Sequence, residues 1–90
     1  MFYNCFNAVK MKKAPLSPTE KKYLNKLAKR LKEHRIKAGY SNYENFAFSN
    51  EIGRTQYGKY ETGGNIQFTT LVKILKALDI TFEEFFKGFD

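Results

Sequence analysis

The sequence predicts an all-α fold with five helices in a single domain. Three observations carry this prediction. Ser/Thr-x-x-Glu capping boxes stand before stretches with helical apolar spacing, glycine or aspartate follows where those stretches end, and no segment shows a convincing strand pattern. Ninety residues lie near the lower end of what one hydrophobic core can stabilise, so two domains are not expected.

The first predicted helix runs from Pro18 to Ala38. Ser17 and Glu20 form a capping box, in which each side chain can bond to the backbone N–H of the other residue. Proline is favourable in the first turn, where its missing N–H has no partner to lose. Gly39 ends the helix. Its apolar stripe consists of Leu24, Leu27, Leu31 and Ala38.

The second helix is short, and two residues compete to cap it. Ser41 with Glu44 makes a second possible capping box, whereas Asn42 would place Phe46 at the fourth helical position. In both cases Phe46 and the following alanine point inward. A turn of about three residues then begins at Asn50.

The third helix is predicted over Arg54 to Thr62, with Tyr57 and Tyr60 on its packed side and two glycines at its end. Gly58, in its interior, should cost about 1 kcal/mol relative to alanine. Either tertiary packing overrides this cost, or a bare backbone is needed there for close approach to a ligand.

The fourth helix is predicted over about Phe68 to Leu78, and Asp79 closes it. A third capping box begins at Thr81. Ile80 before it and Phe85 within the next helix form a hydrophobic staple. These two elements bring the number of predicted helices to five.

Residues 1–16 are predicted to be a flexible N-terminal arm, and residues 17–90 the folded domain. A single cysteine excludes an intramolecular disulfide, and one cysteine with one histidine cannot make a zinc site. No apolar run approaches the ~20 residues that span a bilayer, and no secretory signal is recognisable. We therefore expect a cytoplasmic protein with a free thiol.

Positive charge is concentrated in the first two thirds of the chain. Residues 1–63 carry 13 basic and 5 acidic side chains, whereas residues 64–90 carry 3 and 4, in a chain of net charge +7. This distribution suggests one face for a polyanion and another for protein contacts. A solvated lysine-rich surface explains the charge alone equally well.

Several residues, in order, resemble the Cro/C1-type (XRE) helix-turn-helix family. They are Arg35, Phe46-Ala47, Ile52, Glu61-Thr62-Gly63 and the run from Leu71 to Ile80. The resemblance covers about Leu24 to Phe86. It implies a compact, lambda-repressor-like domain whose third helix enters the DNA major groove while the second lies across the phosphate backbone.

The resemblance also implies site residues, position by position. Base-contacting positions are Arg54, Thr55, Gln56 and Lys59, and positions near phosphates are Asn42, Tyr43 and Thr62. Arg35 and Glu61 are expected to form an ion pair between the first helix and the end of the third. The chain departs from the family pattern at Tyr43, where glutamine is usual, and at Asn50-Glu51, which replaces Leu/Val-Gly.

Four phenylalanines crowd the C-terminal segment and cannot all enter one small core. They are Phe82, Phe85, Phe86 and Phe89. We expect this apolar patch to be a two-fold interface between two copies, with ordinary core packing plus an exposed tail as the alternative.

These observations predict a sequence-specific DNA-binding transcriptional regulator, a repressor-type homodimer on a palindromic site. The first alternative is an antitoxin or adaptor that holds a protein partner through residues 1–9 or the C-terminal phenylalanines. The second is a non-specific basic nucleic-acid binder. No nucleophile with a histidine base and no phosphate loop is recognisable, so an enzyme, a cofactor, a metal and a small-molecule substrate are not expected.

Overall fold

The computed structural model describes residues 15–90, and this part of the chain is all-helical, with no strand. The predicted fold class is therefore confirmed. The five helices are α1 (Pro18–Lys37), α2 (Tyr43–Ser49), α3 (Arg54–Tyr60), α4 (Phe68–Leu78) and α5 (Phe82–Phe85). The predicted N-terminal arm falls on residues 1–16, of which 1–14 lie outside the described residues.

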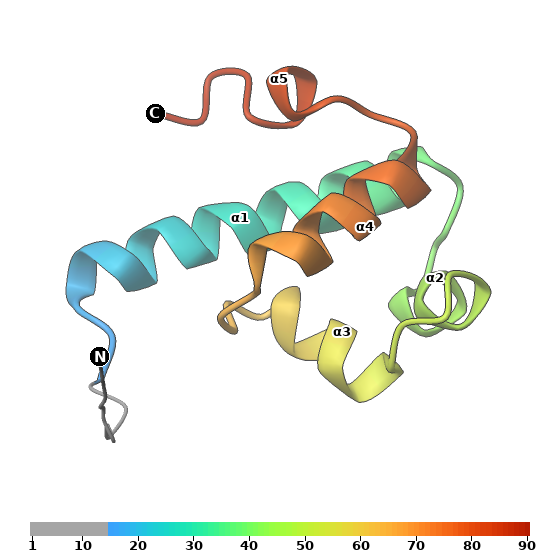
Figure 1. Ribbon diagram of the computed structural model, residues 1–90, viewed down its shortest axis with the longest axis horizontal. Helices are drawn as coiled ribbons and strands as arrows, with labels where there is room; N and C mark the ends of the chain where they lie inside the picture. The colour runs from blue at the N-terminus through green and yellow to red at the C-terminus, as the bar shows by residue number, and fades with distance from the viewer. Residues whose placement is uncertain (1–14) are drawn as a thin grey trace, which may run out of the picture.

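Helix α1 forms the axis of the molecule. Figure 1 shows α2 and α3 below it and α5 above it, with α4 lying against its C-terminal half. The short helices α2 and α3 pack against each other, and α2 also contacts α1. The long first helix thus separates the helix-turn-helix pair from the C-terminal segment.

Local capping bonds set the starts of three helices. The capping box of α1 forms, with the Ser17 N–H donating to Glu20 Oε1 at 2.8 Å and the Glu20 N–H to Ser17 Oγ at 3.1 Å. For α2 the competition is resolved in favour of Asn42, whose side-chain oxygen accepts the N–H of Asn45 at 2.8 Å. In the same way, Thr81 caps α5 by accepting an N–H three residues on.

Every helix contributes one large, fully buried side chain to a common core. These five side chains are Leu31, Phe46, Tyr57, Ile74 and Phe85. Burying each such group stabilises the fold by roughly 1.5–3 kcal/mol. Even the four-residue α5 is therefore anchored in the core rather than lying loosely on the surface.

The burial of Phe85 corrects the predicted interface. This side chain has no exposed surface in the single chain, so it cannot contact a second copy. Phe86 and Phe89 are partly buried, and Phe82 is exposed. The reason is the hydrophobic staple position of Phe85, which turns its ring inward after Thr81.

The residues after α5 are held against α1 by polar contacts that the sequence did not reveal. The Tyr23 hydroxyl donates to Asp90 Oδ1 at 2.7 Å, and Lys26 Nζ donates to the Phe89 carbonyl at 3.0 Å. Arg30 donates to the carbonyl of Phe85 and lies over the Phe89 ring, 5.4 Å from its centroid. The C-terminal segment is therefore fastened along the upper side of α1.

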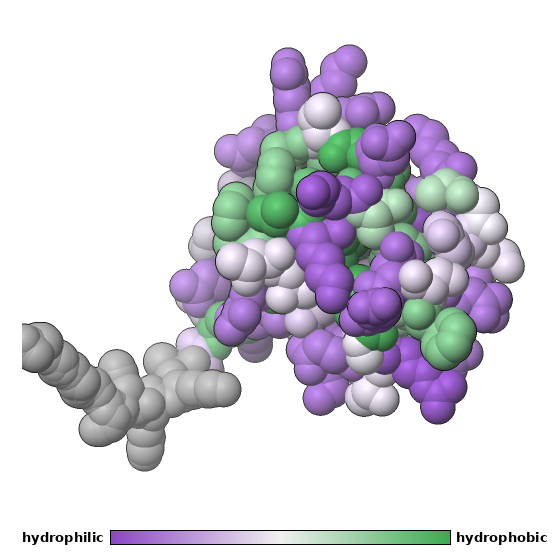
Figure 2. Space-filling model, turned by 45° about the vertical axis from the view of Figure 1, so that its right-hand side comes forward, coloured by the Kyte–Doolittle hydropathy of each residue, from purple (hydrophilic) through white to green (hydrophobic). Residues whose placement is uncertain are grey.

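Within residues 15–90 no helix is both long and apolar enough to cross a membrane. Polar side chains cover most of the face seen in Figure 2, and apolar side chains appear in small areas between them.

Candidate nucleic-acid interface

The turn between α2 and α3 is tight and closed by bonds from its own residues. The Ile52 N–H donates to the Ala47 carbonyl at 2.8 Å, and the Asn50 side-chain amide donates to the Phe46 carbonyl at 2.8 Å. Glu51 takes a left-handed conformation with φ of 57°. Residues other than glycine adopt this conformation at a cost, so Glu51 is locally strained.

Aromatic packing fixes α3 against α2. The rings of Phe46 and Tyr57 lie 5.1 Å apart, and the ring of Tyr40, in the loop before α2, meets Phe46 edge-on at 5.1 Å. Tyr57 and Tyr60 are both buried, which confirms their predicted packing role. One face of α3 is therefore committed to the core.

The opposite face of α3 is exposed and carries the residues predicted to contact bases. Arg54, Thr55, Gln56 and Lys59 are all exposed. Two of them are cationic, one is an amide and one a hydroxyl, so together they can both donate to and accept from base edges. The structure presents these four side chains on one short helix with no part of residues 15–90 covering them.

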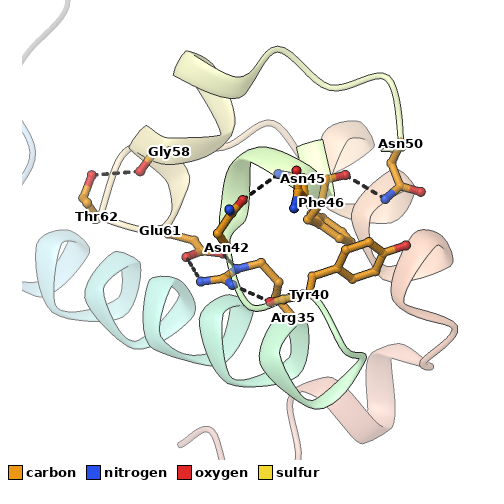
Figure 3. A network of polar contacts seen from close by, with 9 residues as sticks. All are labelled: Arg35, Tyr40, Asn42, Asn45, Phe46, Asn50, Gly58, Glu61 and Thr62. Atoms are coloured by element: carbon orange, nitrogen blue, oxygen red, sulfur yellow. Dashed lines mark hydrogen bonds and ion pairs between the residues drawn. The ribbon is translucent and has the colours of Figure 1, made fainter. Parts of the chain in front are cut away.

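The residues predicted to lie near phosphates differ in the hydrogen-bond donors that the fold leaves unused. The Asn42 oxygen is engaged in capping α2, which leaves its two amide hydrogens available. The Thr62 hydroxyl donates its only hydrogen to the carbonyls of Gly58 and Lys59, at 3.2 and 3.1 Å. Because phosphate oxygens only accept, Thr62 would have to give up this bond to contact one through its side chain (Figure 3).

A buried two-point ion pair ties α1 to the end of α3. Arg35 Nε lies 2.8 Å from Glu61 Oε2, and Arg35 Nη2 lies 3.1 Å from Glu61 Oε1. The third donor, Arg35 Nη1, bonds to the Tyr40 carbonyl at 2.6 Å (Figure 3). The side chains of the pair are 4% and 7% exposed, and the hydrogen bond to Glu61 raises the pKa of Arg35.

We call the Arg35–Glu61 pair the brace. Glu61 is the residue directly after the last turn of α3, which ends at Tyr60 and not at Thr62 as predicted. Glu61 still has a right-handed helical backbone, and Gly63, with φ of 99°, then turns the chain so that the Gly64 N–H donates to the Lys59 carbonyl at 2.7 Å. The brace therefore anchors α3 at its C-terminal end while aromatic packing anchors its centre.

The hydroxyl of Tyr57 is buried beside the brace and has no hydrogen-bond partner. Burial raises the pKa of this phenol, and the nearby Glu61 carboxylate raises it further. A buried hydroxyl without a partner costs stability, roughly 1–3 kcal/mol relative to a satisfied one. Tyr57 therefore stabilises the core through its aromatic ring and not through its hydroxyl group.

The structure brings Tyr43 and Gly58 together, a contact that sequence reasoning did not identify. A β-carbon placed on Gly58 would lie 2.9 Å from Tyr43 Cε1. The glycine thus allows close approach of another part of the same chain. The available signal was the unfavourable glycine inside a helix, but its partner lies fifteen residues earlier and no local pattern names it.

Comparison with known proteins gives one match. A family model described as Helix-turn-helix matches residues 31–85, which is more than half of the chain. No curated protein and no solved structure matches. The matched segment begins in the second half of α1 and includes the brace, the α2–α3 pair and α4.

Proposed function

This chain belongs to the Cro/C1-type helix-turn-helix (XRE) family of DNA-binding regulatory domains, and from this premise we propose that it is a sequence-specific transcriptional regulator. In this proposal α3 enters the major groove and α2 crosses the phosphate backbone. The observation that carries it is the division of α3 into a buried aromatic face and an exposed basic and amide face.

The exposed side chains suit the chemistry of base edges. Arg54 and Lys59 can donate to the O6 and N7 atoms of guanine, and Gln56 can pair with adenine. Thr55 offers a methyl group to thymine or a hydroxyl to a neighbouring acceptor. Asn42 and Tyr43 stand at the start of α2, where side chains would meet phosphates and set the position of α3 without reading sequence.

We further propose that the protein binds DNA as a homodimer through a surface that we call the phenylalanine stack. It consists of Phe68, Phe82 and Phe86, with ring centroids 5.4 Å apart for the first pair and 6.1 Å for the second. Phe68 is 67% and Phe82 36% exposed, so the stacked rings form one apolar cluster that is open to solvent, and contiguous exposed apolar surface favours an interaction site. Two copies joined there could place their recognition helices on half-sites about one helical turn apart.

Selection of duplexes from a random library tests the DNA-binding proposal. We expect a defined motif, and we expect Arg54→Ala or Lys59→Ala to weaken binding to it about 5- to 150-fold, as loss of a base contact worth ~1–3 kcal/mol does. The matched control is Lys87→Ala, which removes the same charge from the segment after α5; Figure 1 shows this segment across α1 from α3.

The pattern of loss distinguishes the alternatives. Weakening by the same factor on every duplex, with Lys87→Ala equal to Lys59→Ala, would indicate a non-specific basic binder. Absence of binding to any duplex, together with a protein that co-purifies with the chain, would indicate an antitoxin or adaptor.

Sedimentation tests the dimer. We expect Phe82→Glu to shift the protein toward monomer, because a charge inside an apolar interface must be desolvated. Phe48→Glu is the control, since Phe48 is 85% exposed and belongs to α2, whereas the phenylalanine stack is built from α4, α5 and the residue after α5. A chain that stays monomeric at tens of micromolar, alone and on the selected duplex, would contradict the dimer.

A further inference from the structure

Gly58 is half-buried, on the side of α3 that faces α2 and next to the exposed face. Residues three and four positions apart on a helix are neighbours, so a side chain at 58 would stand beside Arg54 and Thr55. Both are expected to meet DNA. Gly58 has no side chain, so α3 itself places nothing at this edge of the surface.

The phenol of Tyr43 occupies that place. A β-carbon on Gly58 would lie 2.9 Å from Tyr43 Cε1, 3.1 Å from Cζ and 3.2 Å from the hydroxyl oxygen. A contact of 2.9 Å is shorter than real β-carbon contacts, and the other two are tighter than most, so a larger residue at 58 requires the ring to shift. The outer edge of the Tyr43 side chain, with its hydroxyl, therefore rests on the backbone of α3.

Two features hold the ring in this position. Tyr43 is the first residue of α2, directly after the Asn42 cap, so its backbone is fixed at a helix start. Its ring also packs against the buried Tyr57 ring at 6.4 Å and an angle of 37°. The residue is 37% exposed, so its packed side lies on α3 and part of the phenol reaches solvent.

We propose that Tyr43 supplies the recognition surface with the side chain that Gly58 lacks, and that its hydroxyl is a specificity-determining contact to DNA. This inference rests on the proposed function, in which the exposed face of α3 meets the major groove. A phenol hydroxyl can both donate and accept, so it can bond to base edges as well as to phosphates. In this proposal the Tyr43 hydroxyl contacts a base edge, whereas the family resemblance implied a contact to phosphate.

The position of the Tyr43 ring explains why a glycine stands inside α3 at residue 58. Glycine in a helix interior lowers the ratio of folded to unfolded protein about fivefold relative to alanine. With alanine at 58 the ring would have to swing away from α3, carrying the hydroxyl with it. Gly58 thus weakens α3 slightly but lets the Tyr43 ring lie directly on the helix backbone.

A double-mutant cycle in urea denaturation tests the contact without DNA. In a Tyr43→Ala background, Gly58→Ala should raise the folded-to-unfolded ratio about fivefold, the ordinary gain in helix propensity. In the unaltered background the gain should be smaller or reversed, because the methyl group displaces the ring. Equal effects in the two backgrounds would overturn the proposal, since the residues would then not be coupled.

Binding to the duplex selected by the unaltered protein tests the hydroxyl. Tyr43→Phe keeps the ring and should weaken binding about 2- to 12-fold, the range for one neutral hydrogen bond, and relax the motif at one position. Gly58→Ala should weaken it as well, and the combined variant should bind more tightly than the product of the two losses predicts.

The outcomes separate this inference from the function on which it rests. If Tyr43→Phe binds like the unaltered protein while Lys59→Ala loses affinity, the chain reads DNA without Tyr43 and the inference falls alone. If the unaltered protein selects no duplex, the proposed function and the role of the hydroxyl fall together, and any coupling in the urea cycle reports packing only.

Discussion

Removing the carboxylate of the brace should destabilise the whole domain. Arg35 and Glu61 share two short hydrogen bonds and are almost fully buried. In Glu61→Ala the arginine keeps only the Tyr40 carbonyl as partner and stays charged in a buried site. Breaking one side of such a buried pair costs roughly 3–5 kcal/mol. This is a large part of the ~5–15 kcal/mol that stabilises a typical domain.

The expected loss is large enough for simple assays. For a domain of this size, 1 kcal/mol moves Tm by about 4–8 °C, so the variant should melt at least about 12 °C lower. Urea denaturation should give a lower midpoint with an unchanged slope, because the exposed surface on unfolding stays the same. Glu33→Ala is the control, since it removes an exposed carboxylate from the same helix that carries Arg35.

A second variant separates burial of charge from loss of contacts. Replacing Arg35 and Glu61 together by methionine removes both charges and should be clearly more stable than Glu61→Ala, because no unpaired charge remains in the core. If Glu61→Ala costs less than about 1 kcal/mol, the pair behaves like an exposed one, and the reasoning from its burial is wrong.

Three smaller perturbations test other features. Glu51→Gly should raise the free energy of unfolding by about 0.5–1 kcal/mol in urea, because glycine adopts the left-handed turn without strain, and a loss of stability would argue against that strain. Tyr57→Phe should leave stability equal or higher, by up to about 1 kcal/mol, since it removes a buried hydroxyl without a partner; a clear loss in the same assay would mean that the hydroxyl is bonded. The pKa of His34 lies below its ordinary 6.5, first through burial and then through Lys37 and Arg30. The unfolded chain therefore takes up the proton first as pH falls through 6.5, so stability should drop between pH 7.5 and 5.5 in the unaltered protein and drop less in His34→Gln.

Much of the fold could be predicted because its signals are local. The capping box of α1 acts between residues three positions apart, and the apolar spacing of α4 shows its buried face without reference to other helices. The exposed face of α3 followed in the same way, since burying Tyr57 and Tyr60 turns Arg54 and Lys59 outward. These predictions needed only the geometry of one helix.

Other features could not be predicted because they depend on competition between distant groups. Four C-terminal phenylalanines have similar sequence surroundings, but only Phe85 enters the core, and Phe89 is covered by Tyr23 and Arg30 of α1.

The sequence by itself determined the five helices, the family and the residues on each face of α3, because periodicity, caps and motif spacing act within a few residues. Only the tertiary structure decided that the phenol of Tyr43 covers Gly58 and that the Arg35–Glu61 pair, expected from the family resemblance, is almost fully buried. Both contacts join residues from different helices, and they form only because of how the side chains of those helices pack together.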